Sequence, residues 1–143
     1  MAFKQAALAV LLCALAPNFA KAQETDIANK ISLELNAAQS FDTSCTLTFL
    51  VTNGLDTPID GMTYETVLFD RGGQVNRLTL FNFGDLPPAR ARVRQFAVPD
   101  ITCEGLGRII FNGASICTVS GAPSDVCETG LILSTRTKIE VLG

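Results

Sequence analysis

Histidine and tryptophan are absent from this sequence of 143 residues, and tyrosine occurs once. Histidine is the usual base that activates a serine or cysteine nucleophile, so its absence removes the common catalytic triads. The G-x-S-x-G, G-x-G-x-x-G and P-loop motifs are also missing, and with them the usual signatures of α/β-hydrolases and nucleotide-binding proteins. We therefore predict no catalytic residue, no cofactor and no enzymatic activity.

One enzymatic alternative does not need histidine, because glycoside hydrolysis uses a pair of carboxylates. Glu65, Asp85 and Glu104 are candidates for such a pair. Acidic residues in turns and on strand faces are more often solvated structural groups. A glycosidase-like enzyme is therefore the third hypothesis for this chain.

Basic residues are too few for a nucleic-acid-binding protein. The chain has 11 Lys and Arg against 14 Asp and Glu, a net charge of −3, whereas nucleic-acid phosphates require a strongly basic surface. The scarcity of polar aromatic rings also weakens a second hypothesis, that of a carbohydrate or envelope-polymer binding module. Tyr64 is the one ring of the kind that sugar platforms commonly use.

The first 22 residues have the pattern of a secretory signal peptide. Lys4 provides a basic start, an apolar run covers residues 6–16, and Ala20-Lys21-Ala22 forms a small-x-small cleavage site. The apolar run is shorter than the ~20 residues that cross a bilayer. We expect a periplasmic or secreted protein without stable membrane insertion after cleavage, with a polar lead-in over residues 23–30 and a single domain over residues 31–143.

Four cysteines remain after the predicted cleavage, which also leaves nine Lys and Arg against fourteen Asp and Glu. An even number in an exported chain favours two disulfides. Zinc is not favoured, because the cysteines form no close pair and there is no histidine. Three pairings are open; the short loop between Cys117 and Cys127 favours a local bridge, which leaves Cys45 with Cys103.

Alternating apolar residues predict strands along the whole domain. The stretch from Cys45 to Phe83 contains three of them, CTLTFLVTN, MTYETVLFD and QVNRLTLFNF, separated by turns rich in glycine. ISLELNA precedes them, and ARARVRQFAV, GRIIFNGASIC and GLILSTRTKIEVLG follow. Seven or eight strands at this spacing predict an all-β, antiparallel sandwich of the immunoglobulin-like kind.

The strand ARARVRQFAV is the candidate interaction surface. Arg90, Arg92 and Arg94 have the same parity, which places three guanidinium groups on one face. Phe96 and Val98 have that parity too, so either a bulge re-aims the strand or it passes from an exposed to a covered region. The arginines are either a solvated face paired with acids on a neighbouring strand or a site for an anionic partner.

Several of these residues carry a resemblance to a known family. The strand ending in Asn53, the Phe69-Asp70 pair followed by Gly73, and the Leu86-x-Pro88 turn before Phe96 resemble FxLYD-type and related immunoglobulin-like bacterial sandwich domains over residues 45–100. The chain departs from that pattern in Pro88-Ala89 and in its cysteines. The whole chain is also similar to short exported alphaproteobacterial proteins of unassigned function. Neither resemblance implies a catalytic residue.

Together these features favour binding over catalysis. The first hypothesis is an exported protein-interaction module, or an accessory subunit of an assembly in the cell envelope, with Arg90, Arg92 and Arg94 as the contact surface.

Overall fold

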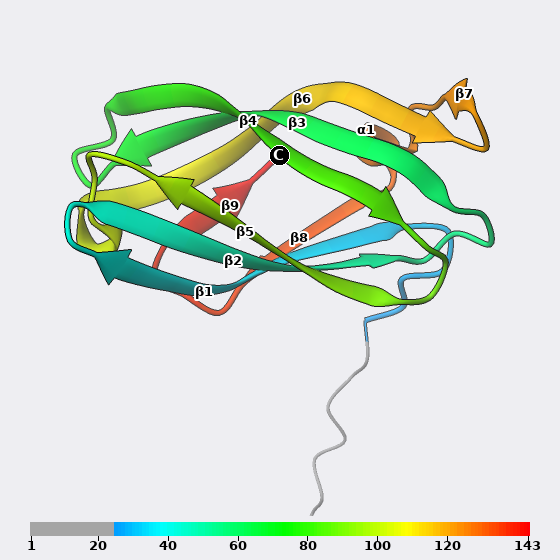
Figure 1. Ribbon diagram of the computed structural model, residues 1–143, viewed down its shortest axis with the longest axis horizontal. Coiled ribbons are helices and arrows are strands. Elements are labelled where there is room, and N and C mark those ends of the chain that lie inside the picture. Colours follow the sequence, from blue (N-terminus) through cyan, green and yellow to red (C-terminus); the bar gives the residue numbers. More distant parts are fainter. Residues whose placement is uncertain (1–24) are drawn as a thin grey trace, which may run out of the picture.

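The computed structural model describes residues 25–143, so the predicted signal peptide over residues 1–22 lies outside the described part. Two β-sheets pack face to face (Figure 1). The strands are β1 (Ile31–Phe41), β2 (Ser44–Asn53), β3 (Ile59–Asp70), β4 (Val75–Leu86), β5 (Ala91–Val98), β6 (Leu106–Val119), β7 (Ala122–Pro123), β8 (Leu131–Thr135) and β9 (Glu140–Leu142). Two short helices, η1 (Cys103–Gly105) and α1 (Val126–Thr129), complete the fold.

The all-β sandwich predicted from the sequence is confirmed, with nine strands rather than seven or eight. One sheet has the order β5-β2-β1-β8, and the other has the order β4-β3-β6-β7 with β9 also paired to β6. Strands β1 to β6 pair antiparallel with their neighbours, but β8 is parallel to β1 and β9 is parallel to β6. The last residues of the chain therefore contribute one short strand to each sheet, and the sheets are mixed rather than purely antiparallel.

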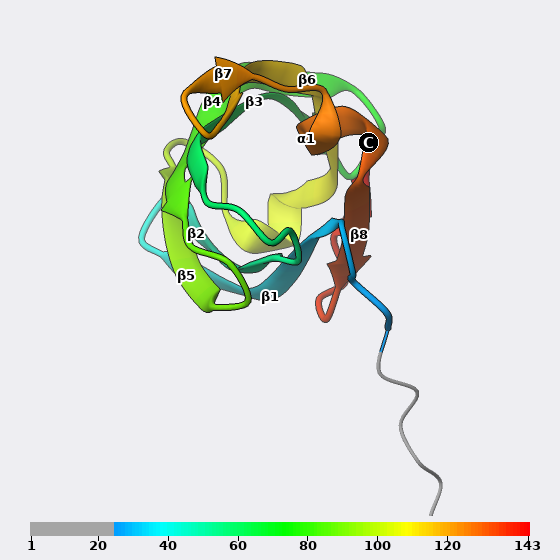
Figure 2. The same ribbon diagram turned by 90° about the vertical axis from the view of Figure 1, so that its right-hand side faces the viewer.

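The core follows from the alternation in β2. Cys45, Leu47, Phe49 and Val51 are fully buried, whereas the residues between them are partly exposed. The Phe49 ring lies at the centre, with its centroid 5.7–6.0 Å from four other phenylalanine rings. Figure 2 shows how the sheets curve around this core when viewed along the strands.

A buried asparagine organises the loops at one end of the sandwich. The Asn53 side-chain amide donates to the carbonyl oxygens of Thr57 (2.9 Å) and Leu86 (3.0 Å). Its side-chain oxygen accepts the N–H of Leu55 (2.9 Å), and its main-chain oxygen accepts the N–H of Ala89 (2.8 Å). Asn53 therefore ties the loop after β2 to the connection between β4 and β5.

Both predicted disulfides are present. Cys45 on β2 is bonded to Cys103 in η1, and Cys117 on β6 is bonded to Cys127 in α1. The bonded cysteines are 58 residues apart in the first bridge and 10 residues apart in the second. The first bridge therefore constrains a much longer segment of the unfolded chain. Disulfides persist in oxidising compartments, which indicates a location outside the cytoplasm.

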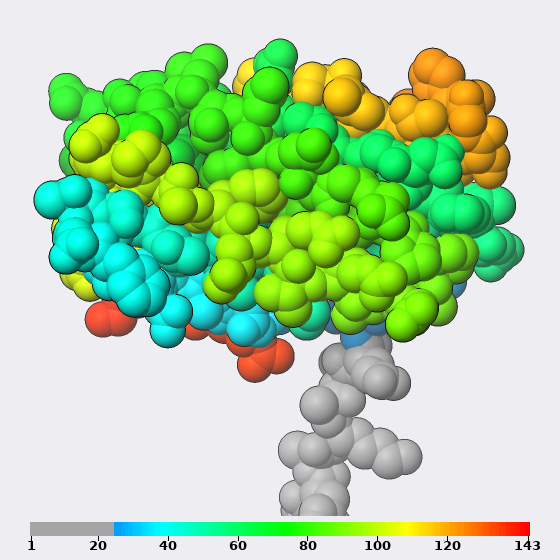
Figure 3. All heavy atoms as spheres, in the orientation of Figure 1, coloured from blue at the N-terminus to red at the C-terminus, as the bar shows by residue number. Residues whose placement is uncertain are grey.

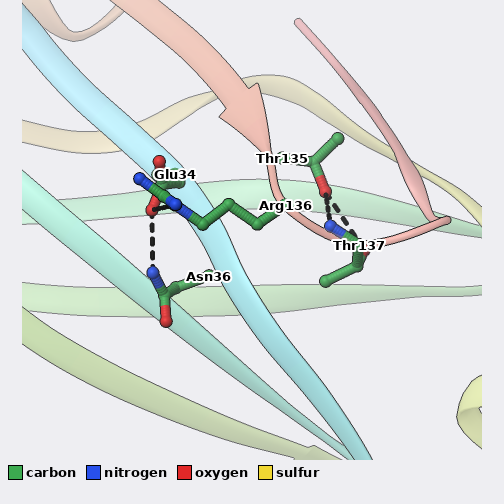
Figure 4. A network of polar contacts seen from close by, with 5 residues as sticks. All are labelled: Glu34, Asn36, Thr135, Arg136 and Thr137. Atoms are coloured by element: carbon green, nitrogen blue, oxygen red, sulfur yellow. Dashed lines mark hydrogen bonds and ion pairs between the residues drawn. The ribbon is translucent and has the colours of Figure 1, made fainter. Parts of the chain in front are cut away.

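At the outer margin of one sheet, a polar network holds β8 against β1. Arg136 follows β8, and its Nε lies 2.9 Å from a carboxylate oxygen of Glu34 on β1 (Figure 4). The Asn36 side chain donates to the same carboxylate, and these two partners lower the pKa of Glu34 despite some desolvation. The Arg136 side chain of this ion pair is exposed to solvent. The pair therefore contributes little to the free energy of unfolding, about 0–1 kcal/mol.

No helix within residues 25–143 is long and apolar enough to cross a membrane.

The titration of the one tyrosine reports whether the core of the protein is folded. Tyr64 is 1% exposed, and its hydroxyl donates to the main-chain oxygen of Cys127 at 2.5 Å. Burial raises the pKa of this hydroxyl well above its usual value of about 10, and the negative charge of Glu128 raises it further. The folded state therefore holds this proton more tightly than the unfolded state does.

We expect the tyrosinate absorbance of the folded protein to stay flat through pH 10 and to appear only as the protein unfolds. The pKa is higher in the folded state, so the contribution of Tyr64 to stability is complete below about pH 10 and is lost as the pH rises above it. In guanidinium chloride the same group should titrate near its ordinary pKa of about 10. A normal titration without loss of structure would contradict the buried position of Tyr64.

Candidate interaction surface

Positive charge is concentrated in the segment 75–98, which comprises β4, β5 and the connection between them. This segment contains four arginines and one aspartate, whereas the other 119 residues contain seven Lys and Arg against thirteen Asp and Glu. The segment is therefore a basic region on an otherwise acidic protein. Electrostatic attraction favours an acidic partner at such a region.

The strand β5 runs along β2 without interruption. The pairs extend from Cys45 with Val98 to Thr52 with Ala91, and no register shift occurs between them. Of the two alternatives for this strand, the bulge is therefore not observed. The strand instead passes from a covered end, where Val98 is buried, to a more exposed end at Arg92 and Arg90.

The strands β4 and β5 lie side by side across the front of the molecule, although they belong to different sheets (Figures 1 and 3). Beneath this seam the Phe96 ring stacks on the Phe81 ring at 4.3 Å and meets the Phe83 ring edge-on at 5.2 Å. Aromatic packing of this kind fixes β5 against β4. The strand that carries Arg92 and Arg94 is therefore held in place by aromatic packing.

Arg94 spans the seam and is used structurally. Its Nε donates to the main-chain oxygen of Phe83 at 2.7 Å, and one of its terminal nitrogens donates to that of Asp85 at 3.2 Å. The other terminal nitrogen donates to the main-chain oxygen of Val93 at 3.2 Å. All three guanidinium nitrogens thus bind carbonyl groups, and two of these bonds satisfy the backbone of β4.

Unlike Arg94, neither Arg90 nor Arg92 donates a side-chain hydrogen bond to a carbonyl group within residues 25–143. Arg90 is exposed and Arg92 is partly exposed, and neither takes part in a side-chain hydrogen bond or ion pair with another described residue. The two ion pairs of the described chain are Arg108 with Glu140 and Arg136 with Glu34. The strand β5 begins at Ala91, one residue later than Arg90, so only Arg92 and Arg94 of the three arginines lie on it. None of the three is paired with an acid on a neighbouring strand, and the guanidinium groups of Arg90 and Arg92 have no partner among the described residues.

The three carboxylates considered for glycoside hydrolysis lie on different elements. Glu65 is on β3, Asp85 is near the end of β4 and Glu104 is in η1. The Glu104 carboxylate accepts the Ser40 hydroxyl at 2.8 Å, and this bond is the main cause of its lowered pKa. A general acid needs a raised pKa, so the environment of Glu104 acts in the opposite direction.

No group of three or more His, Cys, Asp or Glu side chains that could hold a metal ion occurs among residues 25–143.

Sequence reasoning missed an exposed apolar surface on β4. Leu78 and Leu80 are 70% and 60% exposed, whereas Phe81 and Phe83 of the same strand are buried. The signal was present in the segment RLTLFNF, because the leucines have one parity and the phenylalanines have the other. Apolar residues of both parities showed that one set had to face outward from the sandwich.

Replacing Arg94 tests the division between structural and available arginines. We expect Arg94→Ala to lower the free energy of unfolding by about 1–3 kcal/mol, because carbonyl groups of β4 lose their donors. Arg92→Ala is the matched control on the same strand, and we expect a change within about 0.5 kcal/mol. Denaturant unfolding measures both values, and equal losses in the two variants would contradict this assignment.

Comparison with known proteins adds information about the fold. No protein-family model matches the sequence, and no curated protein matches it. The chain is similar in structure to IrmA from Escherichia coli, with a TM-score of 0.59, 15% sequence identity, and coverage of 73% of this chain and 90% of that chain. At this identity the likeness shows the fold alone. The resemblance to FxLYD-type domains stays a prediction.

Proposed function

We propose that this protein is an exported, non-catalytic binding module that contacts a protein partner in the cell envelope through Arg90 and Arg92. The proposal rests on one observation, that neither side chain has a polar partner among the described residues. Arg92 lies on the edge strand β5 and Arg90 directly precedes it, within the basic segment 75–98 of an acidic protein, and neither side chain forms a hydrogen bond or ion pair with a described residue.

The chemistry of the guanidinium group defines the partner surface. Arginine presents a planar set of donors that binds carboxylate groups in bidentate geometry. Arg92 lies on β5 and Arg90 lies two residues before it, directly ahead of the strand, so their Cα atoms are at most ~7 Å apart. Two carboxylates on an acidic segment or on an acidic strand of the partner would match this spacing. An accessory subunit docked on a larger assembly would make this kind of contact.

The export of the protein is supported by two independent features. The first 22 residues have the pattern of a signal peptide, and the two disulfides require an oxidising compartment. We infer a periplasmic or secreted location from their combination.

A polymer-binding role receives less support. Sugar platforms commonly present tyrosine or tryptophan rings to the solvent, but the chain has no tryptophan and its tyrosine is buried in the core. An anionic envelope polymer could still bind to arginine side chains. Binding to such a polymer is therefore one of the outcomes that the experiment below distinguishes.

Charge reversal at the two arginines tests the proposal. The tagged protein is crosslinked in cells and captured beside the variant Arg90→Glu with Arg92→Glu, and bound proteins are identified by mass spectrometry. We expect one dominant partner whose recovery falls roughly tenfold or more in the variant, which corresponds to about 1.4 kcal/mol.

The matched control places the same charge change elsewhere. Lys30 and Lys138 are exposed, so Lys30→Glu with Lys138→Glu alters net charge equally and should leave capture intact. Equal loss in both variants would show that net charge alone governs the interaction. No specific protein in any sample, together with retention on an anionic polymer, would replace the protein partner with a polymer ligand.

A further inference from the structure

The strand β4 leaves one edge unpaired over part of its length. Its ladder partner among the described residues is β3, on one side only. Towards the end of β4, Arg94 donates to the carbonyl groups of Phe83 and Asp85 and covers that part of the edge. In the earlier part, residues 76–82, the Phe96 ring packs against Phe81, but no described side chain or second strand forms a hydrogen bond with the backbone of this edge. An exposed edge of this kind is a template for pairing with another strand.

The outer face of the same sheet is apolar where it meets this edge. The register places Leu78 beside Val67 of β3, Val67 beside Ile110 of β6, and Ile110 beside Leu142 of β9. The exposure of this row is greatest at the edge, where Leu78 is 70% exposed, and Val67 and Ile110 are only partly exposed. A shallow cleft of about 280 Å³ lies against Leu78, Leu80 and Glu65. The uncovered apolar area is therefore concentrated on the edge strand itself.

The sequence of this edge is nearly palindromic about Thr79. Residues 76–82 read N-R-L-T-L-F-N, so that asparagine is three residues away on each side and leucine is one residue away on each side. Both asparagines and both leucines are exposed on the outer face. A palindromic strand can pair antiparallel with itself, because a two-fold axis through its centre places identical residues opposite each other.

We propose that the edge of β4 pairs with β4 of a second copy of this chain, about a two-fold axis at Thr79. Leu78 of each copy then lies opposite Leu80 of the other, and Asn76 lies opposite Asn82. Arg77 lies opposite Phe81, and the two Thr79 residues face each other on the axis. Side chains directly opposite in an antiparallel pair are about 4.5–5.5 Å apart at Cβ, so the four leucines form one apolar cluster.

This pairing goes beyond the proposed function, because it uses Leu78 and Leu80 of β4 and not Arg90 and Arg92. The second copy is favoured over an unrelated partner by the matched asparagine and leucine pairs, which only an identical strand supplies in this order. The ladder covers only residues 76–82, because Arg94 covers the backbone beyond them. A short interface implies an association that depends on protein concentration.

Two charge patterns test the pairing and its register. Leu78→Lys with Leu80→Lys places like charges opposite each other at both leucine pairs, whereas Leu78→Lys with Leu80→Glu places opposite charges there. Sedimentation equilibrium of the purified, disulfide-bonded protein measures association up to a concentration on the order of 1 mM. We expect dimers of the unaltered protein, monomers of the Lys/Lys variant, and dimers of the Lys/Glu variant that dissociate as salt is added.

The edge strand of the other sheet supplies the control. Val93 on β5 is 58% exposed, so Val93→Lys makes a similar surface change outside residues 76–82 and should leave the dimer intact. Thermal unfolding of each variant checks that the fold is retained. A monomeric unaltered protein, or the same association in the Lys/Lys and Lys/Glu variants, would overturn the proposal. A monomer whose leucine variants lose a captured protein would assign this edge to a different partner.

Discussion

The hydrogen bonds of the buried Asn53 side chain are the constraint on which the functional end of this sandwich depends. The side chain has no exposed area, so each of its polar atoms needs a partner within the protein. Its partners belong to the loop after β2 and to the connection from β4 to β5. Asn53, at the end of β2 in one sheet, is thus bonded to Leu86 at the end of β4 in the other sheet and to Ala89 in the connection that leads to β5.

The two strands joined by the connection that Asn53 holds present two different chemistries. On β5, the Arg94 guanidinium donates to three main-chain carbonyl groups, whereas Arg92 on this strand and Arg90 just before it are the two arginines of the proposed contact. On β4, the phenylalanines face the core and the leucines face the solvent. The same structural bond of Arg94 also limits how much of the β4 edge can pair with another strand. One arginine therefore separates the proposed acidic-partner surface from the proposed self-pairing edge.

Local patterns in the sequence predicted much of this fold. Period-two alternation identified the inward residues of β2, and loop length favoured the bridge between Cys117 and Cys127. The parallel strands β8 and β9 were not predictable in this way, because pairing between distant segments leaves no local period. The role of Arg94 was also hidden, since two of its three acceptors are main-chain carbonyl groups that lie 9 and 11 residues earlier on a strand of the other sheet. The sequence showed three equivalent arginines, and only tertiary structure distinguishes them.

Amide hydrogen exchange of the Asn53→Ala variant tests whether Asn53 holds the connection between β4 and β5. The substitution removes the bonds to Thr57, Leu86 and Leu55 while the core strands keep their own ladders. We expect faster exchange that is confined to residues 54–58 and 84–98, with protection retained in β3 and β6. A uniform rise in exchange across the protein, or no change over residues 84–98, would contradict this role of Asn53.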